Sequence, residues 1–278
     1  MYNSPLLESI AHYKILERVG ESPLGEVFRA RDTRLGRTVA IKIPPATIQI
    51  DTAKRDALIA DARTAMALSH PNIAALYEVG DDNGRVFLAC EFVPGDSLDR
   101  VIAGHPLNAR RAIDITAQVA DALADAHAVD FAHGDLTKDS IVVTPKGAAK
   151  TLDFGLARWT RADGKPGDQA GDLRSLRRLF FEMLTGRPPG DQAMPPSSVN
   201  KSLPAEVDPL VMKDYEMAVT FAADLRAVGA ILEVRAEALD KTRGTLGRKA
   251  PRSKAPLVAV VLAVLVAGLT AAWWYFRR

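Results

Sequence analysis

Three charged residues occupy positions from which they could handle phosphate groups. Lys42 ends a short apolar strand pattern, Asp135 lies in a loop after a long helical pattern, and Asp153 directly follows a predicted strand. Upstream of Lys42, a turn between two predicted strands carries a glycine at each end, in the order Gly20-Glu21-Ser22-Pro23-Leu24-Gly25. Phosphoryl transfer needs such parts: backbone N–H groups over the phosphates, a lysine to neutralise them, a carboxylate for Mg²⁺ and another for the attacking hydroxyl. Because this chemistry is mostly positioning and electrostatics, few residue types suffice.

Strands and one helix are predicted to position these residues in the first part of the chain. Segments rich in β-branched residues and bounded by turn residues predict strands over 13–20, 26–31, 38–43, 74–79 and 86–92. The last two are joined by the turn Asp81-Asp82-Asn83-Gly84. Asp51 or Thr52 is expected to cap a helix that runs to about Leu68.

The second part of the chain is mainly helical in its pattern. Apolar periodicity predicts helices over about 108–128, 172–185, 206–217 and 220–239, with two short strands at 141–144 and 149–152. Five prolines between residues 187 and 204 predict an irregular loop. A strand-rich first part and a helical second part predict a two-lobed α+β fold.

The motifs, in their order along the chain, resemble those of the protein kinase family, and specifically of bacterial transmembrane Ser/Thr protein kinases. The resemblance runs from about Tyr13 to Leu239. It is carried by the glycine turn, by Val-Ala-Ile-Lys ending at Lys42, by His-x-Asp ending at Asp135 and by Asp-Phe-Gly starting at Asp153. It implies a protein-kinase-like fold with an N-lobe at about 13–93, a shortened C-lobe at about 94–240, and ATP with Mg²⁺ as cofactors.

The resemblance also implies residue roles. Lys42 would bind the α- and β-phosphates, Asp153 would hold Mg²⁺, and Asp135 would be the catalytic base. Asp172 would brace the catalytic loop, and Cys90 would precede the hinge that meets adenine. The implied nucleotide-binding residues are Gly20, Ser22, Gly25, Val27, Ala40, Lys42, Glu91, Val93, Ser140 and Asp153, and the implied structural residues are Asp61, His133, Phe154, Gly155 and Asp172. Taken singly, Lys42 could instead be a surface strand lysine, Asp135 a turn residue and Asp172 a helix cap, but their combined order disfavours this.

Several residues depart from the family pattern in the nucleotide-binding half. The middle glycine of the loop is Ser22, and Pro23 removes a backbone N–H from a loop that works by offering such groups to phosphate. The helix residue expected to pair with Lys42 is Asp61 rather than glutamate, so its reach is shorter by one methylene. An equally good interpretation makes Asp61 a solvated helix charge that pairs with Arg63 or Lys54.

The catalytic loop departs from the pattern at three positions. Gly134 replaces the arginine that usually contacts a phosphorylated activation loop, and Thr137 replaces a lysine, although Lys138 is adjacent. Ser140 replaces the asparagine that binds Mg²⁺, so a second metal position should be weak or missing.

The segment that would hold a protein substrate is shortened. Only 18 residues separate Asp153 from Asp172, and the sequence contains no Ala-Pro-Glu. Three functions are therefore compared: a pseudokinase that binds ATP and acts in signalling, an active Ser/Thr protein kinase, and a membrane adaptor without nucleotide. The losses favour the pseudokinase, while Lys42 and Asp153 disfavour the adaptor.

The charge of the chain is divided between its parts. Residues 1–240 carry 28 basic and 34 acidic residues, a net charge of −6, whereas residues 241–278 carry +8. A nucleic-acid partner is not expected, because the folded part is acidic. The single cysteine excludes an internal disulfide.

Residues 257–276 form an uncharged, apolar run that ends in Trp273, Trp274 and Tyr275. A helix of this length spans a bilayer, and the long apolar run disfavours a buried core helix. The basic residues between 241 and 254 predict that residues 1–240 face the cytoplasm, since cationic flanks remain inside; attraction to anionic lipid is the less favoured role for them. No secretory signal is expected at the N-terminus. We therefore predict a kinase-like domain at 1–240, a basic linker at 241–256 and a single span at 257–276 in the inner membrane, with an unknown protein partner or substrate.

Overall fold

The computed structural model describes residues 7–156, 159, 161 and 164–247. The chain divides into two compact units at residues 231 and 232, and the elements that hold the candidate site belong to the first. Within that unit, a strand-rich lobe precedes a helical lobe, in agreement with the predicted two-lobed α+β fold.

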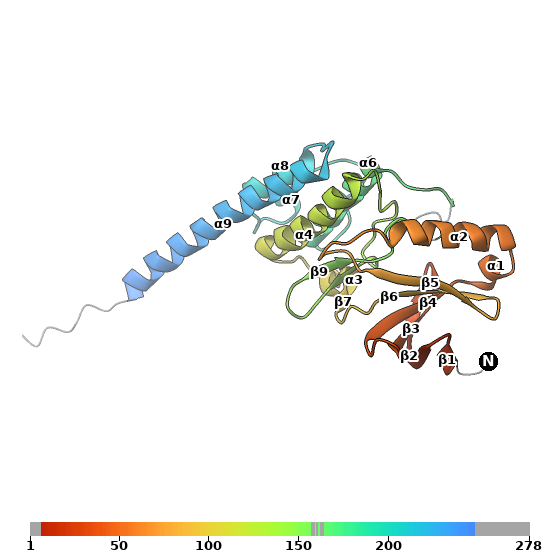
Figure 1. The fold of residues 1–278 in the computed structure, drawn as a ribbon. Helices are drawn as coiled ribbons and strands as arrows, with labels where there is room; N and C mark the ends of the chain where they lie inside the picture. The colour runs from red at the N-terminus through yellow and green to blue at the C-terminus, as the bar shows by residue number, and fades with distance from the viewer. Residues whose placement is uncertain (1–6, 157–158, 160, 162–163, 248–278) are drawn as a thin grey trace, which may run out of the picture. The chain divides into compact units, whose positions relative to one another are not determined.

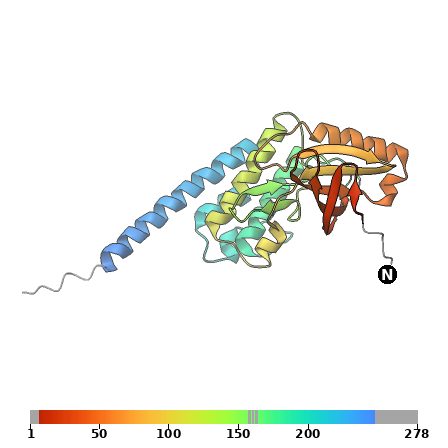
Figure 2. The same ribbon diagram turned by 60° about the horizontal axis from the view of Figure 1, so that its bottom comes forward.

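The first lobe is built on an antiparallel sheet of six strands in the order β1-β2-β3-β4-β6-β5. Its strands are β1 (Ser9–Ile10), β2 (Tyr13–Ser22), β3 (Gly25–Asp32), β4 (Thr38–Ile43), β5 (Leu76–Asp82) and β6 (Arg85–Glu91). Helices α1 (Ala46–Gln49) and α2 (Thr52–Ala65) lie along one side of this sheet in both views (Figures 1 and 2). Strand β4 therefore lies inside the sheet, between β3 and β6, where it can hold a side chain firmly.

The five predicted strands of this lobe are confirmed with small shifts of their ends. The β5–β6 turn is also confirmed: Asn83 and Gly84 adopt positive φ values of 53° and 82°, as a tight hairpin turn requires. Asp51 caps α2 by accepting a hydrogen bond from the Lys54 backbone N–H at 3.1 Å. Helix α2 ends at Ala65 rather than near Leu68.

The second lobe combines a small sheet with helices. Strands β7 (Asp96–Ser97), β8 (Ile141–Val143) and β9 (Ala149–Thr151) pair in that order. The main helices are α4 (Ala109–His127) and α6 (Gln169–Thr185), which lie side by side in Figures 1 and 2. The remaining helical segments are α3 (Leu98–Ile102), α7 (Pro196–Val199), the 3₁₀ turn η1 (Ala205–Val207), α8 (Asp208–Met212) and α9 (Ala218–Gly247).

Four predictions for this lobe need correction. Helix α6 begins at Gln169 with Asp168 as its cap, three residues before the predicted start. The proline-rich stretch contains α7, and the helix predicted at 206–217 is instead η1 followed by α8. Helix α9 continues to Gly247, so the first residues of the predicted basic linker are helical. The short elements β1, β7, α1 and α3 were not predicted, since two to five residues carry too little periodicity.

Two apolar clusters form the core of the first lobe. One joins β1, β2, β3, β4 and β6 around residues such as Tyr13, Ile41 and Phe87. The other lies between the sheet and α2, and it includes Leu58 and Ala62 of the helix. This second cluster also receives Leu156 from the far lobe, so it connects α2 to the segment that follows Asp153.

Residues 257–276, the predicted membrane span, lie outside the described residues. Within the part of the chain that the structure describes, no helix is both long enough and apolar enough to cross a bilayer.

Candidate nucleotide-binding and catalytic site

Lys42 and Asp153 form the electrostatic centre of the site. Lys42 extends from β4, and Asp153 follows β9 in the opposite lobe. The Lys42 Nζ lies 2.6 Å from both Oδ1 and Oδ2 of Asp153. The two side chains are only 6% and 13% exposed, so water screens the pair weakly. Burial alone would lower the pKa of Lys42, but the Asp153 carboxylate outweighs burial and the net shift is upward. Lys42 is therefore charged at neutral pH.

Asp153 is held in an uncommon backbone conformation. Its φ is +60°, in the left-handed region, which costs a non-glycine residue about 1–2 kcal/mol. Such strain persists only where surrounding contacts over-determine the backbone. The double contact to Lys42 is one of these contacts, because it fixes the direction of the Asp153 side chain.

A cavity of about 740 Å³ lies between the lobes around this pair. Its walls combine apolar side chains, such as Val27 and Ala40, with a few polar groups, as is usual for a small-molecule site. Of the residues predicted to bind nucleotide or take part in catalysis, the lining contains Gly20, Ser22, Val27, Ala40, Lys42, Glu91, Val93, Asp135, Ser140 and Asp153. Gly25 is the predicted nucleotide-binding residue that does not line it.

The glycine turn is a tight connection between β2 and β3. The Ser22 hydroxyl donates to the Gly25 carbonyl oxygen at 3.2 Å. Gly25 has a φ of +121°, and a Cβ at this position would lie 2.0 Å from the Ile43 carbonyl oxygen, so only glycine fits. Leu24 is fully buried in the cluster beside α2. The tip of the turn is therefore anchored to the lobe.

The hinge connects β6 to the second lobe. A carboxylate oxygen of Glu91 lies 2.8 Å from the Lys150 Nζ of β9, and the same oxygen accepts from the Ala75 N–H at 3.2 Å. Cys90, which precedes the hinge, lines the cavity. Burial raises the pKa of its thiol to about 12, so it is protonated at neutral pH.

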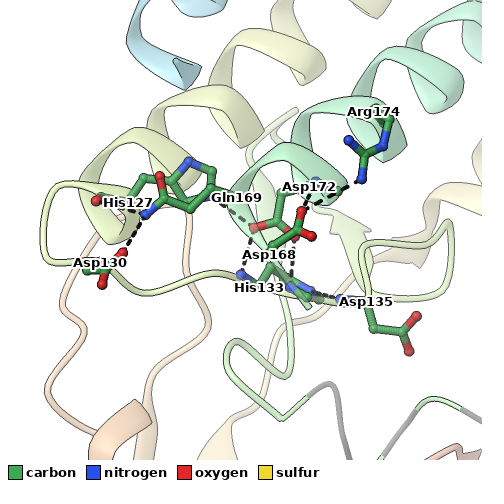
Figure 3. A network of polar contacts seen from close by, with 10 residues as sticks. His127, Asp130, His133, Asp135, Asp168, Gln169, Asp172 and Arg174 are labelled. Atoms are coloured by element: carbon green, nitrogen blue, oxygen red, sulfur yellow. Dashed lines mark hydrogen bonds and ion pairs between the residues drawn. The ribbon is translucent and has the colours of Figure 1, made fainter. Parts of the chain in front are cut away.

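Asp172, in the first turn of α6, holds the catalytic loop through hydrogen bonds to its backbone (Figure 3). Its Oδ2 accepts from the His133 N–H at 2.8 Å, and its Oδ1 accepts from the Gly134 N–H at 2.7 Å. The His127 Nε2 lies 2.9 Å from the same Oδ2. Asp172 is 1% exposed, and a buried carboxylate needs such partners. These are the contacts that a brace of the loop requires.

His133 orients the residues around Asp135. Its Nε2 lies 2.9 Å from the Leu152 carbonyl oxygen, and its Nδ1 accepts from the Asp135 N–H at 3.2 Å. Burial lowers the pKa of His133 despite the nearby Asp172. The ring is therefore neutral, with its proton on Nε2. The His133 and Phe154 rings pack in a T-shaped arrangement, with centroids 4.8 Å apart.

The Ser140 side chain is used within the catalytic loop. Its hydroxyl donates to the Thr137 carbonyl oxygen at 2.9 Å and accepts from the Thr137 N–H at 2.9 Å. In return, the Thr137 hydroxyl accepts from the Ser140 N–H at 3.3 Å. These contacts close a local turn and occupy most of the bonding capacity of the hydroxyl.

Lys138 is a site residue whose partners the sequence did not reveal. Its Nζ lies 2.9 Å from Asp99 of α3 and 2.9 Å from Glu182 of α6. Hydrogen bonds to Asp99 and Glu182 raise the pKa of Lys138. Lys138 therefore ties the catalytic loop to α3 and α6.

Asp61 does not pair with Lys42. Its Oδ2 accepts a hydrogen bond from the indole Nε1 of Trp159 at 2.8 Å, while Lys54 pairs with Asp51. A hydrogen-bond partner of Asp61 is thus Trp159, whereas the two sequence interpretations expected Lys42, Lys54 or Arg63. Trp159 was not predicted as a site residue, because its contact joins segments 98 residues apart in the sequence.

The chain between Asp153 and α6 lies against the catalytic loop. The Arg161 Nη1 donates to the Gly134 carbonyl oxygen at 3.2 Å. A Cβ on Gly167 would lie 2.1 Å from the Gly134 Cα, so the two backbones are in direct contact. Asp61, Gly155 and residues 166–170 line a second cavity of about 610 Å³.

The donor set of the larger cavity fits Mg·ATP. It offers one buried ammonium, one carboxylate with both oxygens facing that ammonium, and apolar walls near a hinge with backbone groups. Within the described residues, no group of three or more His, Cys, Asp or Glu side chains could hold a metal ion by itself. Phosphate oxygens normally complete the Mg²⁺ shell at sites of this kind.

Comparison with known proteins agrees with this geometry. The chain is 28% identical over 293 residues to the serine/threonine-protein kinase pkn3 of Myxococcus xanthus, covering 90% of this chain and 53% of that protein. It is 29% identical over 262 residues to PrkC of Bacillus subtilis, covering 77% of this chain and 40% of that protein. The chain therefore spans about half, or less, of the length of these curated relatives.

A solved structure shows the same fold. The kinase domain of Mycobacterium tuberculosis PknI matches with a TM-score of 0.67 at 22% identity, over 79% of this chain and 97% of that one. The family model described as the protein kinase domain matches residues 13–174. Because that match covers more than half of a chain that also has the two-lobed fold, this chain belongs to the protein kinase domain family.

Proposed function

We propose that this chain is an ATP-binding pseudokinase, with weak or no phosphotransfer and a regulatory role in signalling. Lys42 and Asp153 support nucleotide binding, since they face each other in the cavity between the lobes. Lys42 would neutralise phosphate oxygens, Asp153 would hold Mg²⁺, and the backbone of Glu91 and Val93 would meet adenine. The bound Mg²⁺ would supply charge neutralisation of the phosphates.

The observation that carries the pseudokinase proposal is the turn made by Ser140. A hydroxyl that already donates to and accepts from the Thr137 backbone is a poor metal ligand. The short segment after Asp153 adds to this, because Gly167 packs on the catalytic loop where an incoming substrate chain would need room. A loss of only about 1.4 kcal/mol of transition-state stabilisation lowers the rate tenfold, so small losses at these two places are enough to weaken phosphotransfer.

Two alternative functions compete with this proposal. An active Ser/Thr protein kinase is favoured by Asp135, which lines the same cavity as Lys42 and Asp153, and by the names of the similar bacterial kinases. An adaptor that binds no nucleotide is favoured by the Lys42–Asp153 pair, since its two charges satisfy each other without a ligand.

A thermal shift assay with Mg·ATP tests nucleotide binding. A ligand that binds only the folded chain raises its stability, by about 2.7 kcal/mol at 100 times Kd. We expect a clear shift for the wild-type chain and a much smaller one for the double variant Lys42→Met/Asp153→Asn, which leaves no stranded charge. Lys201→Met, an exposed lysine, serves as the matched control and should keep the full shift. No wild-type shift at millimolar Mg·ATP would favour the adaptor.

Transfer of radiolabelled γ-phosphate tests catalysis. We expect little or no transfer to the chain itself or to a generic protein substrate. Strong transfer that is lost in Asp135→Asn would identify an active kinase and contradict the pseudokinase proposal.

We also propose that residues 257–276 anchor the chain in the inner membrane, with residues 1–240 in the cytoplasm. The proposal is supported by the uncharged length of this segment and by the basic residues before it.

A further inference from the structure

Phe131 packs against the backbone of Gly155, which follows Asp153 and Phe154 in the sequence. A Cβ added to Gly155 would lie 2.2 Å from the Phe131 Cζ and 2.3 Å from its Cε1. Non-bonded carbon atoms prefer a separation of about 3.5–4.0 Å, so the tip of the ring fills the space that a side chain at residue 155 would take. Gly155 also has a φ of +71°, which favours glycine. The ring and the glycine backbone are therefore in direct contact.

The loop that carries Phe131 is anchored to two helices. The Phe131 N–H donates to the Ala126 carbonyl oxygen of α4 at 3.0 Å, and the Asp130 N–H donates to the His127 carbonyl oxygen at 3.0 Å. The Asp130 Oδ1 accepts from the Gln169 Nε2 of α6 at 3.1 Å (Figure 3). Because α4 and α6 fix its backbone, Phe131 is a firm support for whatever packs on its ring.

Asp153 and Leu156 enclose the turn that this ring supports. The Leu156 N–H donates to the Asp153 carbonyl oxygen at 3.2 Å. The Asp153 carboxylate reaches Lys42, and Leu156 is 2% exposed in the apolar cluster beside α2. Between them, Gly155 has no side chain for its neighbours to hold. Its backbone position therefore depends on what packs on it, and the Phe131 ring does so.

Asp153 needs a firm turn because its own backbone is strained. Its φ of +60° lies in the left-handed region, which a non-glycine residue leaves when its surroundings allow. If Gly155 could pivot, the Asp153 backbone could relax to a more common conformation. Its carboxylate would then move from the position in which it faces Lys42.

We infer that Phe131 is a positioning residue of the nucleotide site: through Gly155, it holds the Asp153 carboxylate where the Mg²⁺ of a bound nucleotide would be held. This inference rests on the proposed binding of Mg·ATP. Phe131 lines the smaller cavity, whereas Lys42 and Asp153 line the larger one. Phe131 therefore acts through the backbone and does not touch the nucleotide.

The Mg²⁺ dependence of nucleotide affinity tests this role. Calorimetry on the full chain in detergent measures the Kd of a non-hydrolysable ATP analogue with Mg²⁺ and with EDTA. In Phe131→Ala we expect the Kd in EDTA to stay unchanged, because Lys42 and the hinge keep their places. The tightening that Mg²⁺ produces should fall about tenfold, since only a fraction of the folded molecules would present Asp153 to the metal.

A purely structural role of Phe131 predicts a different result. It would lower the melting temperature and leave the ratio of the two Kd values as in the wild-type chain. Val129→Ala is the matched control: it lies on the same loop, its side chain is 69% exposed, and it should keep the wild-type ratio. Phe131→Leu keeps a branched apolar side chain and should recover part of the Mg²⁺ effect.

A second variant decides if Phe131→Ala does not fold. Phe131→Tyr adds a hydroxyl at Cζ, the ring atom nearest to the Cβ position of Gly155. The hydroxyl must push the turn away, so this variant should also lose Mg²⁺-dependent tightening. A wild-type ratio of Kd values in Phe131→Tyr would overturn the positioning role.

The outcomes separate this inference from the proposed function. A wild-type ratio in Phe131→Ala overturns the positioning role and leaves nucleotide binding in place. Equal Kd values with Mg²⁺ and with EDTA in the wild-type chain overturn the inference and the metal role of Asp153, but not nucleotide binding. A wild-type chain that binds the analogue in neither condition overturns both proposals.

Discussion

At the scale of single residues, the energetics of the site depend on charges that water barely reaches. Lys42 and Asp153 each lose hydration on burial, and their mutual attraction offsets this loss. Removing one partner of such a pair costs about 3–5 kcal/mol, because it strands the other charge. A ligand that separates the pair must therefore offer each charge a replacement, as phosphate oxygens and Mg²⁺ would.

His133 predicts a pH dependence of stability. Burial lowers its pKa below the ordinary value of 6.5, whereas unfolding returns the ring to water. Below pH 6.5, His133 binds a proton in the unfolded chain but stays neutral in the folded chain. The stability that the neutral, buried His133 contributes is therefore present above pH 6.5 and is lost on acidification. Urea unfolding between pH 7.5 and 5.5, a range of about one unit on either side of 6.5, should show a falling free energy.

Substitution identifies the origin of that slope. His133→Gln should flatten the decrease with falling pH, although the variant is less stable throughout. His105→Gln changes an exposed histidine and should keep the wild-type slope. An unchanged slope in His133→Gln would show that other groups cause the acid sensitivity.

At the scale of elements, the catalytic loop is fixed by neighbours distant in sequence. Asp172 of α6 holds its start, and Lys138 joins its middle to α3 and α6. The segment before α6 packs directly on it through Gly167 and Gly134. The loop is thus enclosed on several sides, which limits how a substrate chain could approach Asp135.

Gly167→Ala tests this enclosure. Gly167 has no positive φ, so the reason for glycine there is the close approach of the Gly134 backbone. An added methyl group must push the two segments apart, which should lower the free energy of unfolding by about 1–3 kcal/mol. Urea denaturation measures this change. Gly190→Ala is the matched control, since nothing lies within 4 Å of its added Cβ, and it should change stability by less than about 0.5 kcal/mol. Equal stabilities of the two variants would contradict the contact.

At the scale of the whole molecule, the acidic residues 1–240 and the basic, apolar tail differ in composition, and the proposed membrane anchor rests on this difference. The −6 charge of residues 1–240 suits water, whereas residues 257–276 carry no charge over a length that spans a bilayer. Two units of the structure divide at residues 231 and 232, within α9.

Deletion of residues 257–278 should move the protein from the membrane fraction to the soluble fraction. A finer test is Val264→Arg/Val266→Arg, because an arginine at the centre of a span costs about 2.5–3.5 kcal/mol. The matched control Val264→Leu/Val266→Leu should stay in the membrane fraction after carbonate extraction. Retention of the deleted chain in the membrane would contradict the anchor.

The strands and long helices could be predicted because the period of each is visible in a local stretch of sequence. Strand β4 and helix α4 are within a residue of their expected ends, since a short run rich in β-branched residues marks the strand and apolar periodicity marks the helix. The start of α6 was misplaced because the helix begins at its cap, Asp168, whose side chain accepts from the Gly171 backbone N–H, and α9 continues beyond its predicted end to Gly247. Elements of two to five residues were not predicted, because they are too short to show a period.

By itself, the sequence was enough to predict the family and the two lobes and to select Lys42, Asp135 and Asp153 as candidates, because the order of motifs can be read without knowledge of packing. Only the tertiary structure decided which carboxylate Lys42 meets, that Trp159 takes Asp61, and that Ser140 turns back on Thr137. The first two of these contacts depend on how α2, β4 and the segment after Asp153 pack against one another. Such packing sums many contacts of about 0.1–0.2 kcal/mol between residues far apart in the chain, and no local pattern records that sum.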